Sequence, residues 1–185
     1  IDDELIDVIA SEPKIVKYLD IPIQHCNDKI LSTMHRRGDK KLIVELFAKL
    51  RARIPGLVIR TSLIAGLPGE GEEEFQELCQ FLREQRMERV GAFVFSPEEG
   101  TPAATMEHVD EEVARERAQT LEMIQSQIMD EYNAAQIGKT LEVLVDGYDE
   151  EQEQFYGRTY ADSPDIDGRV WIASEEPLHE GDFVN

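Results

Sequence analysis

The chain has 185 residues, a net charge of −20, and apolar and aromatic contents of 41 % and 7 %, enough for one or two domains with packed cores. It contains no apolar run of the ~18–20 residues that a transmembrane helix needs, so we expect no membrane partner. The strong negative charge argues against the whole chain wrapping a nucleic acid, because phosphates would be repelled.

The two cysteines, Cys26 and Cys79, lie far apart in the sequence. Their number and spacing fit neither a disulfide framework nor a metal-binding pair, and we expect a cytoplasmic, reduced protein. We also expect no signal peptide. Because the first residue is Ile rather than Met, we expect the chain to be cut from a longer one.

The first part of the chain alternates predicted strands and helices. After a helix-like segment at 2–10, strands are expected at 17–24, 57–65 and 89–95, and helices at 40–53, 72–86 and 110–136. One helix between successive strands is typical of βαβ units, with parallel strands and right-handed crossovers. Three strands alone would leave two open sheet edges, so we interpret residues 1–136 as the C-terminal half of a larger β/α barrel of the TIM type.

Residues 137–185 are predicted to form a second, all-β domain. Short β-rich segments at 140–145, 155–161 and 169–172 are separated by turn-rich segments, which indicates a small antiparallel barrel or sandwich. It is expected to be incomplete, because Asn185 falls inside a forming strand. Residues 138–185 hold 13 acidic and 3 basic residues, a net charge of −10.

Polar side chains alternate with apolar ones in the first two strands. Arg60 and Ser62 share one face of the second strand, and Asp20 and Gln24 are the polar residues of the first. Because outer helices cover apolar faces, we expect these four side chains to face the barrel interior, where such barrels bind ligands. An Arg and a Gln suit a ligand with a carboxylate and hydroxyls, but an internal ion pair between Arg60 and Asp20 explains them equally well.

Two other segments contain groups with possible chemistry. The glycine-rich loop 66–71 precedes a helix, a position that favours phosphate, but the next turn is acidic and the loop lacks the Gly-Lys-Ser/Thr of a Walker loop. We interpret it as a tight turn with acidic capping. His25 and Cys26 are adjacent, and sequence neighbours rarely face each other, so we expect a loop with no nucleophile or metal site.

Several segments, in this order, resemble radical S-adenosylmethionine methylthiotransferases. The segments are residues 20–25 (DIPIQH), 34–38 (MHRRG), 60–70 (RTSLIAGLPGE) and 95–103 (FSPEEGTPA). Residues 157–172 (GRTYADSPDIDGRVWI) resemble a TRAM domain, which is a small β-barrel. The resemblance implies an α/β fold: the C-terminal half of a radical S-adenosylmethionine β/α barrel, followed by a truncated TRAM barrel.

The resemblance also implies an activity. Such enzymes add a methylthio group, either to the β-carbon of an aspartate on protein twelve of the small ribosomal subunit or to an adenosine in transfer RNA. Residues 160–168 resemble the first branch, and an acidic domain favours a basic ribosomal protein over RNA. We expect Asp162, Asp165 and Asp167 to contact that partner. Transfer RNA modification and a non-catalytic protein-binding module are the alternatives.

The cofactors that the resemblance implies are S-adenosylmethionine and two 4Fe-4S clusters, one of them bound by a CxxxCxxC loop. This chain contains neither set of cysteines, so we expect the cluster ligands and catalytic residues outside it, and the chain alone to be inactive. The resemblance implies that Ile64 touches the adenine and that Phe95 and Ser96 end the strand beside it. Gln24 and Arg60 are the candidates for the carboxylate and ribose.

Overall fold

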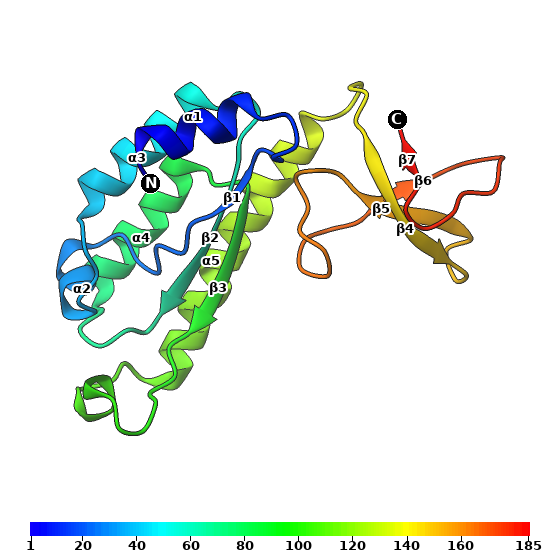
Figure 1. Cartoon of the computed structure of the whole chain (residues 1–185). Coiled ribbons are helices and arrows are strands. Elements are labelled where there is room, and N and C mark those ends of the chain that lie inside the picture. Colours follow the sequence, from blue (N-terminus) through cyan, green and yellow to red (C-terminus); the bar gives the residue numbers. More distant parts are fainter.

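The computed structural model describes all residues, 1–185, in two parts joined by a long helix (Figure 1). The elements of the first part are α1 (Asp3–Ser11), β1 (Tyr18–Asp20), α2 (Asp28–Thr33), α3 (Lys40–Arg53), β2 (Val58–Ala65), α4 (Glu72–Gln85), β3 (Arg89–Val94), η1 (Pro102–Thr105) and α5 (Glu111–Ala134). Those of the second part are β4 (Val143–Asp149), β5 (Gln154–Arg158), β6 (Val170–Ile172) and β7 (Phe183–Val184).

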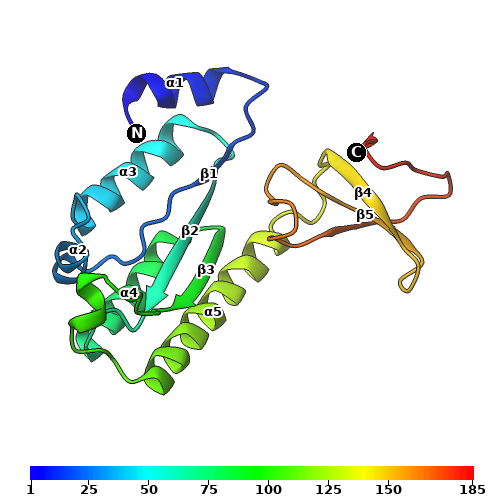
Figure 2. The ribbon, with the colours of Figure 1, turned by 60° about the horizontal axis from the view of Figure 1, so that its bottom comes forward.

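The first part is an open parallel sheet in the order β1-β2-β3. The two outer strands pair only with β2, so the sheet does not close within this chain. Helices α1 and α3 lie to one side of the strands, while α5 runs along β3 towards the second part (Figures 1 and 2). This is the expected half of a β/α barrel, with parallel strands connected through helices.

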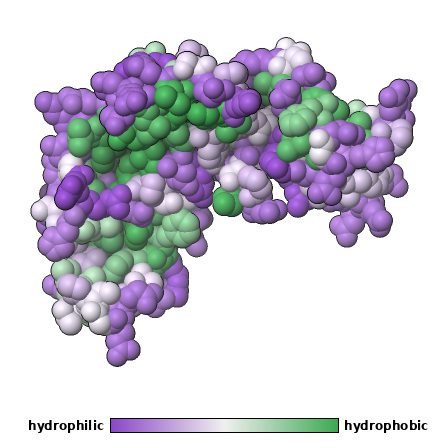
Figure 3. Space-filling view, in the orientation of Figure 1, coloured by the Kyte–Doolittle hydropathy of each residue, from purple (hydrophilic) through white to green (hydrophobic).

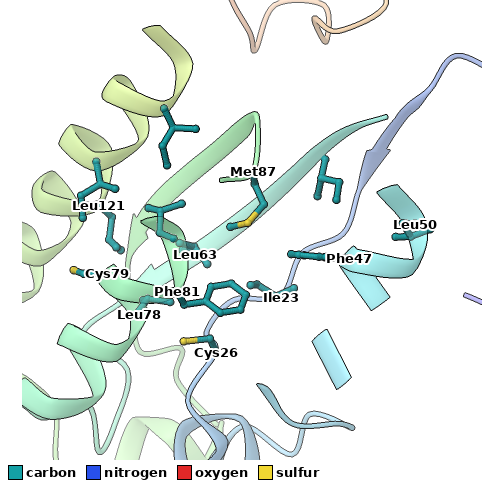
Figure 4. Packing of buried hydrophobic residues seen from close by; sticks show 14 of the residues in the cluster. Ile23, Cys26, Phe47, Leu50, Leu63, Leu78, Cys79, Phe81, Met87 and Leu121 are labelled. Carbon is teal, nitrogen blue, oxygen red and sulfur yellow. The ribbon is translucent and has the colours of Figure 1, made fainter. Parts of the chain in front are cut away.

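The helices cover one face of the sheet. In β2, Ile59, Leu63 and Ala65 are buried, whereas Arg60 and Ser62 on the other face are only half-buried. The buried side chains join one apolar cluster to which α1, α3, α4 and α5 all contribute. Figure 4 shows labelled members of this cluster. The predicted alternation of β2 is therefore confirmed, and its polar face is the one that no helix covers.

The first strand is shorter than predicted. Pro22 has no N–H to donate, and the regular ladder of β1 stops before it. The buried Thr61 hydroxyl replaces the missing contacts: it donates to the Ile21 carbonyl (2.8 Å) and accepts from the Ile23 N–H (3.1 Å). Pairing resumes with a single bridge at Gln24. The prediction of one continuous alternating strand over 17–24 is therefore wrong.

The helices follow their sequence patterns closely. Helix α3 has the predicted bounds, and its cap residue Asp39 accepts the Leu42 N–H at 2.8 Å. Helix α4 begins at Glu72, where Glu74 accepts the Gly71 N–H at 2.9 Å. Helix α2 was not predicted, since its six residues are too few for a periodic pattern. None of the helices combines the length and apolarity that crossing a membrane requires.

The second part is an antiparallel sheet in the order β6-β5-β4-β7. Strand β4 reaches Asp149, further than the predicted 140–145, because Tyr148 packs edge-on against Phe155 (ring centroids 5.0 Å apart). The turn between β4 and β5 is therefore short, because the two strands stay paired up to the tip of the hairpin. There the Asp149 carboxylate accepts the N–H groups of Glu151 and Gln152, at 3.0 Å each.

The segment after β5 packs against the amino ends of the parallel strands. Arg89 Nη2 donates to Asp162 Oδ1 at 2.7 Å, and Tyr18 donates its hydroxyl proton to Asp167 at 2.8 Å. Tyr160 reaches the Gly56 carbonyl at 2.8 Å. Burial and the bond to Asp167 raise the pKa of Tyr18 far above its ordinary value, so the phenol stays a proton donor. Polar contacts thus connect the two parts.

Candidate functional site

The helix-free face of the sheet is polar near the amino ends of its strands. Arg60 is in register with Asp20 on β1 and with Arg89 on β3. Arg60 donates to the Asp20 carboxylate, so the structure forms the ion pair that the sequence left open. Arg60 is four positions before Ile64, or about 13 Å along an extended strand. Its side chain reaches part of this way, because Nη2 would lie 4.0 Å from a Cβ built on Gly91.

Towards the carboxyl ends the same face becomes apolar. Half-buried Ile64 is in register with Phe93, whose side chain is 53 % exposed. Next to them, Ser62 is in register with Gly91. A Cβ at Gly91 would lie 3.1 Å from the Phe93 ring, a tight contact, so glycine helps to keep this part of the face clear. A flat apolar group such as adenine fits a surface of this kind.

A cavity of about 610 Å³ lies where β2 and β3 end. Phe95 and Ser96 line it, together with Gly66 and His108. The Phe95 N–H continues the ladder to the Ala65 carbonyl at 2.9 Å, and its ring tilts against that of His108 (centroids 5.8 Å apart). Phe95 and Ser96 are thus near Ile64, at the end of the strands where β/α barrels bind ligands.

Gln24 has an unusual backbone conformation, with φ of +70°. Its N–H donates to the Ser62 carbonyl at 2.9 Å, and its carbonyl accepts the Ile64 N–H at 2.8 Å. The left-handed region is costly for residues other than glycine, and such strain gathers at functional sites. The structure places the Gln24 backbone beside that of Ile64, through a kinked segment rather than a regular strand.

A buried ionic cluster behind this face was missed by sequence reasoning. Glu70 accepts the Gly66 N–H at 3.0 Å and an Arg117 Nη1–H at 2.8 Å, and His25 Nε2 lies 3.4 Å from its other oxygen. The Glu70 carboxylate thus uses an amide of the 66–71 loop that a phosphate would need. Arg117 lies on the buried stripe of α5, between Ala114 and Ala118. A charge within an apolar stripe is a pattern that could have revealed the cluster.

Both cysteines are buried in the apolar cluster. Burial, with the negative Glu77 nearby, raises the pKa of Cys26 to about 12, and burial also raises the pKa of Cys79. The chain holds no group of three or more His, Cys, Asp or Glu residues that could bind a metal ion. The residues present therefore do not fit an iron–sulfur cluster, which is held by several cysteine thiolates.

We predict that neither cysteine reacts with a thiol reagent at pH 8 while the chain is folded. Almost no thiolate exists at that pH, and both side chains are enclosed. Labelling with a chromogenic disulfide should give no fast phase in the native state and two equivalents after denaturation. Rapid native labelling of either thiol would contradict the buried positions of Cys26 and Cys79.

The predicted partner-binding aspartates differ in accessibility. The side chains of Asp162 and Asp167 are 9 % and 7 % exposed, and both face Arg89. Only Asp165 is exposed. The expectation of a three-residue docking surface is therefore corrected for Asp162 and Asp167, because their carboxylates join the two parts of the chain.

The accessible acidic residues of the second part lie elsewhere. Most are at the β4–β5 tip and in the segment before β7, namely Glu150, Glu151, Glu153, Glu175, Glu176, Glu180 and Asp182, and Glu142 lies just before β4. Hydrophilic residues cover much of the outer end of this part in Figure 3. Its arginines are engaged internally, Arg158 with Asp146 and Arg169 over the Tyr156 ring at 4.3 Å. The outer surface is thus strongly negative.

Comparisons with known proteins agree with this architecture. A family profile described as the radical SAM superfamily matches residues 1–82, and one described as the TRAM domain matches residues 137–185. Among solved structures, a radical SAM enzyme, coproporphyrinogen III oxidase (HemN) from Escherichia coli, has a TM-score of 0.57 at 19 % identity, covering 69 % of this chain and 30 % of that one. The predicted half of a radical SAM barrel followed by a TRAM domain is confirmed.

Curated relatives share sequence along almost the whole chain. A ribosomal protein uS12 methylthiotransferase RimO from Anaeromyxobacter sp. (strain Fw109-5) is 51 % identical over 98 % of this chain and 39 % of its own length. The protein of the same name from Acetivibrio thermocellus is 46 % identical over 100 % and 41 %. The chain thus spans about two fifths of these relatives. Residues 1–82 are thus similar to the radical SAM superfamily, residues 137–185 are similar to TRAM domains, and the chain is similar throughout to the proteins named RimO.

Proposed function

We propose that this protein, at full length, is a radical SAM methylthiotransferase that modifies the β-carbon of an aspartate on ribosomal protein uS12. The observation that carries the proposal is the 46–51 % identity, over nearly the whole chain, to proteins named uS12 methylthiotransferase. The acidic outer surface of the TRAM domain supports a basic protein partner, because opposite charges favour encounter. Work on ribosomal proteins would place the enzyme in the cytoplasm.

In this proposal the chain supplies one wall of the S-adenosylmethionine site. Ile64 contacts the adenine, and Phe95 and Ser96 border it at the end of β3. Gln24 binds the ribose or the carboxylate. Arg60 is paired with Asp20 nearer the amino ends of the strands. Its positive charge attracts the carboxylate of S-adenosylmethionine. When bound at its cluster, S-adenosylmethionine supplies the oxidising power to remove hydrogen from an unactivated carbon.

We predict that Gln24→Ala and Gln24→Gly both lower the affinity for S-adenosylmethionine about tenfold, since each removes the amide and with it ~1.4 kcal/mol of contact energy. They should differ in stability: glycine accepts a φ of +70° and should be more stable than alanine by about 1 kcal/mol. Calorimetric titration and thermal unfolding of the full-length protein measure both effects. Unchanged affinity in both variants would show that the Gln24 side chain does not contact S-adenosylmethionine.

The cofactor content tests the proposed function. We expect the full-length protein, after anaerobic reconstitution, to hold two 4Fe-4S clusters with ligands outside these 185 residues. Residues 1–185 alone should hold none, because Cys26 and Cys79 are buried and too few for a cluster. Iron analysis and visible absorbance measure both samples. A stoichiometric cluster on residues 1–185, or none on the full-length protein, would contradict the proposal.

A further inference from the structure

His25, Glu70 and Arg117 form a buried cluster that the proposed cofactor wall does not include. The side chains of His25 and Glu70 are fully buried, and that of Arg117 is 10 % exposed. The cluster joins three elements at one end of the sheet. His25 directly follows the Gln24 bridge, Glu70 closes the loop after β2, and Arg117 comes from α5.

The His25 ring has a defined tautomer. Its Nδ1 accepts the Asn27 N–H at 2.9 Å, so the ring proton is on Nε2. Nε2 faces Glu70 Oε2 at 3.4 Å, and these two atoms are among the few buried side-chain atoms without a hydrogen-bond partner. A buried donor and a buried acceptor, neither of which has a hydrogen-bond partner, thus lie close together inside the protein.

The rest of the Glu70 carboxylate is fixed from two sides. Oε1 accepts the Gly66 N–H at 3.0 Å and Arg117 Nη1–H at 2.8 Å, and the same Arg117 nitrogen donates to the Glu70 carbonyl at 3.0 Å. Arg117 is held in turn over the Phe75 ring, 5.1 Å from its centroid. One carboxylate therefore joins α5 to the loop that begins two residues after Ile64.

We propose that His25, Glu70 and Arg117 are positioning residues for the S-adenosylmethionine wall. His25 directly follows Gln24, and its buried ring fixes the chain there and so keeps Gln24 in its left-handed conformation, while Glu70 and Arg117 fix the loop that continues from Ile64. A non-glycine residue with φ of +70° persists only where its surroundings determine it, and the buried His25–Glu70 contact is such a constraint. This inference rests on the proposed function, because it takes Gln24 and Ile64 as cofactor contacts.

The test compares three variants of the full-length, reconstituted protein by anaerobic calorimetry with S-adenosylmethionine. His25→Leu removes the donor and should weaken binding about tenfold, the scale of one lost contact. His25→Gln keeps an N–H donor near the position of Nε2 and should restore most of the affinity. Leu121→Ala is the matched control. It lies one turn beyond Arg117 and is fully buried, so it should lower stability without changing affinity.

The outcomes separate the inference from the proposed function. If the unchanged protein fails to bind S-adenosylmethionine, the proposed function is wrong. If it binds and His25→Leu binds equally well, the positioning role is wrong. If Leu121→Ala weakens binding as much as His25→Leu does, lost stability alone explains the effect and the positioning role is again wrong.

The position of the ring proton of His25 can be measured without a variant and without an active enzyme. Long-range ¹H–¹⁵N correlation spectra of the histidine-labelled protein should show the His25 proton on Nε2. A proton on Nδ1 would break the contact with Asn27, and the inference would then be overturned.

Discussion

Replacing Arg89 with methionine is expected to lower the free energy of unfolding by about 3–5 kcal/mol, the usual cost of leaving buried charges without their partner. Arg89 lies 2.7 Å from Asp162 and 3.9 Å from Asp167, and all three side chains are less than a tenth exposed. The guanidinium also lies over the Tyr132 ring, at 5.3 Å. Methionine keeps much of the volume but leaves two buried carboxylates unpaired.

Arg60 offers a matched control, because it is in register with Arg89 on the neighbouring strand. Its partner Asp20 is 45 % exposed, so Arg60→Met should cost at most about 1 kcal/mol. Urea denaturation of both variants measures the difference. Adding Asp162→Asn and Asp167→Asn to Arg89→Met should recover part of the loss, because the buried charges are then removed together. Equal losses for Arg89→Met and Arg60→Met would show that the charges joining the two parts are not critical.

Gly66→Ala is expected to cost about 2–5 kcal/mol, combining overpacking with a strained backbone. Gly66 has φ of +81°, and a Cβ built there would overlap the Cβ of Ala114 on α5. The new methyl group would push α5 away from the end of β2. Because Glu70 accepts the Gly66 N–H, the loop beside the proposed cofactor wall would shift too.

Gly100→Ala separates the cost of overpacking from the cost of backbone strain. Gly100 has nearly the same φ, +82°, but nothing lies within 4 Å of its added Cβ. That variant should lose only the backbone contribution, about 1 kcal/mol. Combining Gly66→Ala with Ala114→Gly should remove the overlap and restore the steric part. Thermal unfolding distinguishes the variants, and equal losses at Gly66 and Gly100 would refute the close approach of α5.

The first part of the fold was largely predictable because its pattern is local. Helix α3 and the two faces of β2 follow from the spacing of apolar residues, which burial then enforces. Strand β1 was misread, because alternation alone ignores the missing N–H of Pro22 and cannot foresee that Thr61 would replace the ladder bonds. A side chain 40 positions away in sequence supplies the contacts that follow the end of this strand.

The candidate site was less predictable, because it depends on contacts between distant residues. Gln24, Ile64 and Phe95 lie at one end of the sheet, but the His25–Glu70 contact behind them joins residues far apart in the sequence and has no periodic pattern. A count of charges likewise cannot tell Asp165, which is exposed, from Asp162, which is buried against Arg89. Only the packing of the TRAM domain against the barrel separates them.

The most direct test of the account is the mass of uS12 after incubation with the reconstituted full-length protein, S-adenosylmethionine, a reductant and a sulfur source. The proposal predicts that one aspartate of uS12 gains a methylthio group in place of hydrogen, and that omitting S-adenosylmethionine abolishes the change. Transfer RNA in a parallel reaction should stay unmodified. An unchanged uS12, with or without a methylthiolated adenosine in the transfer RNA, would contradict the proposed function.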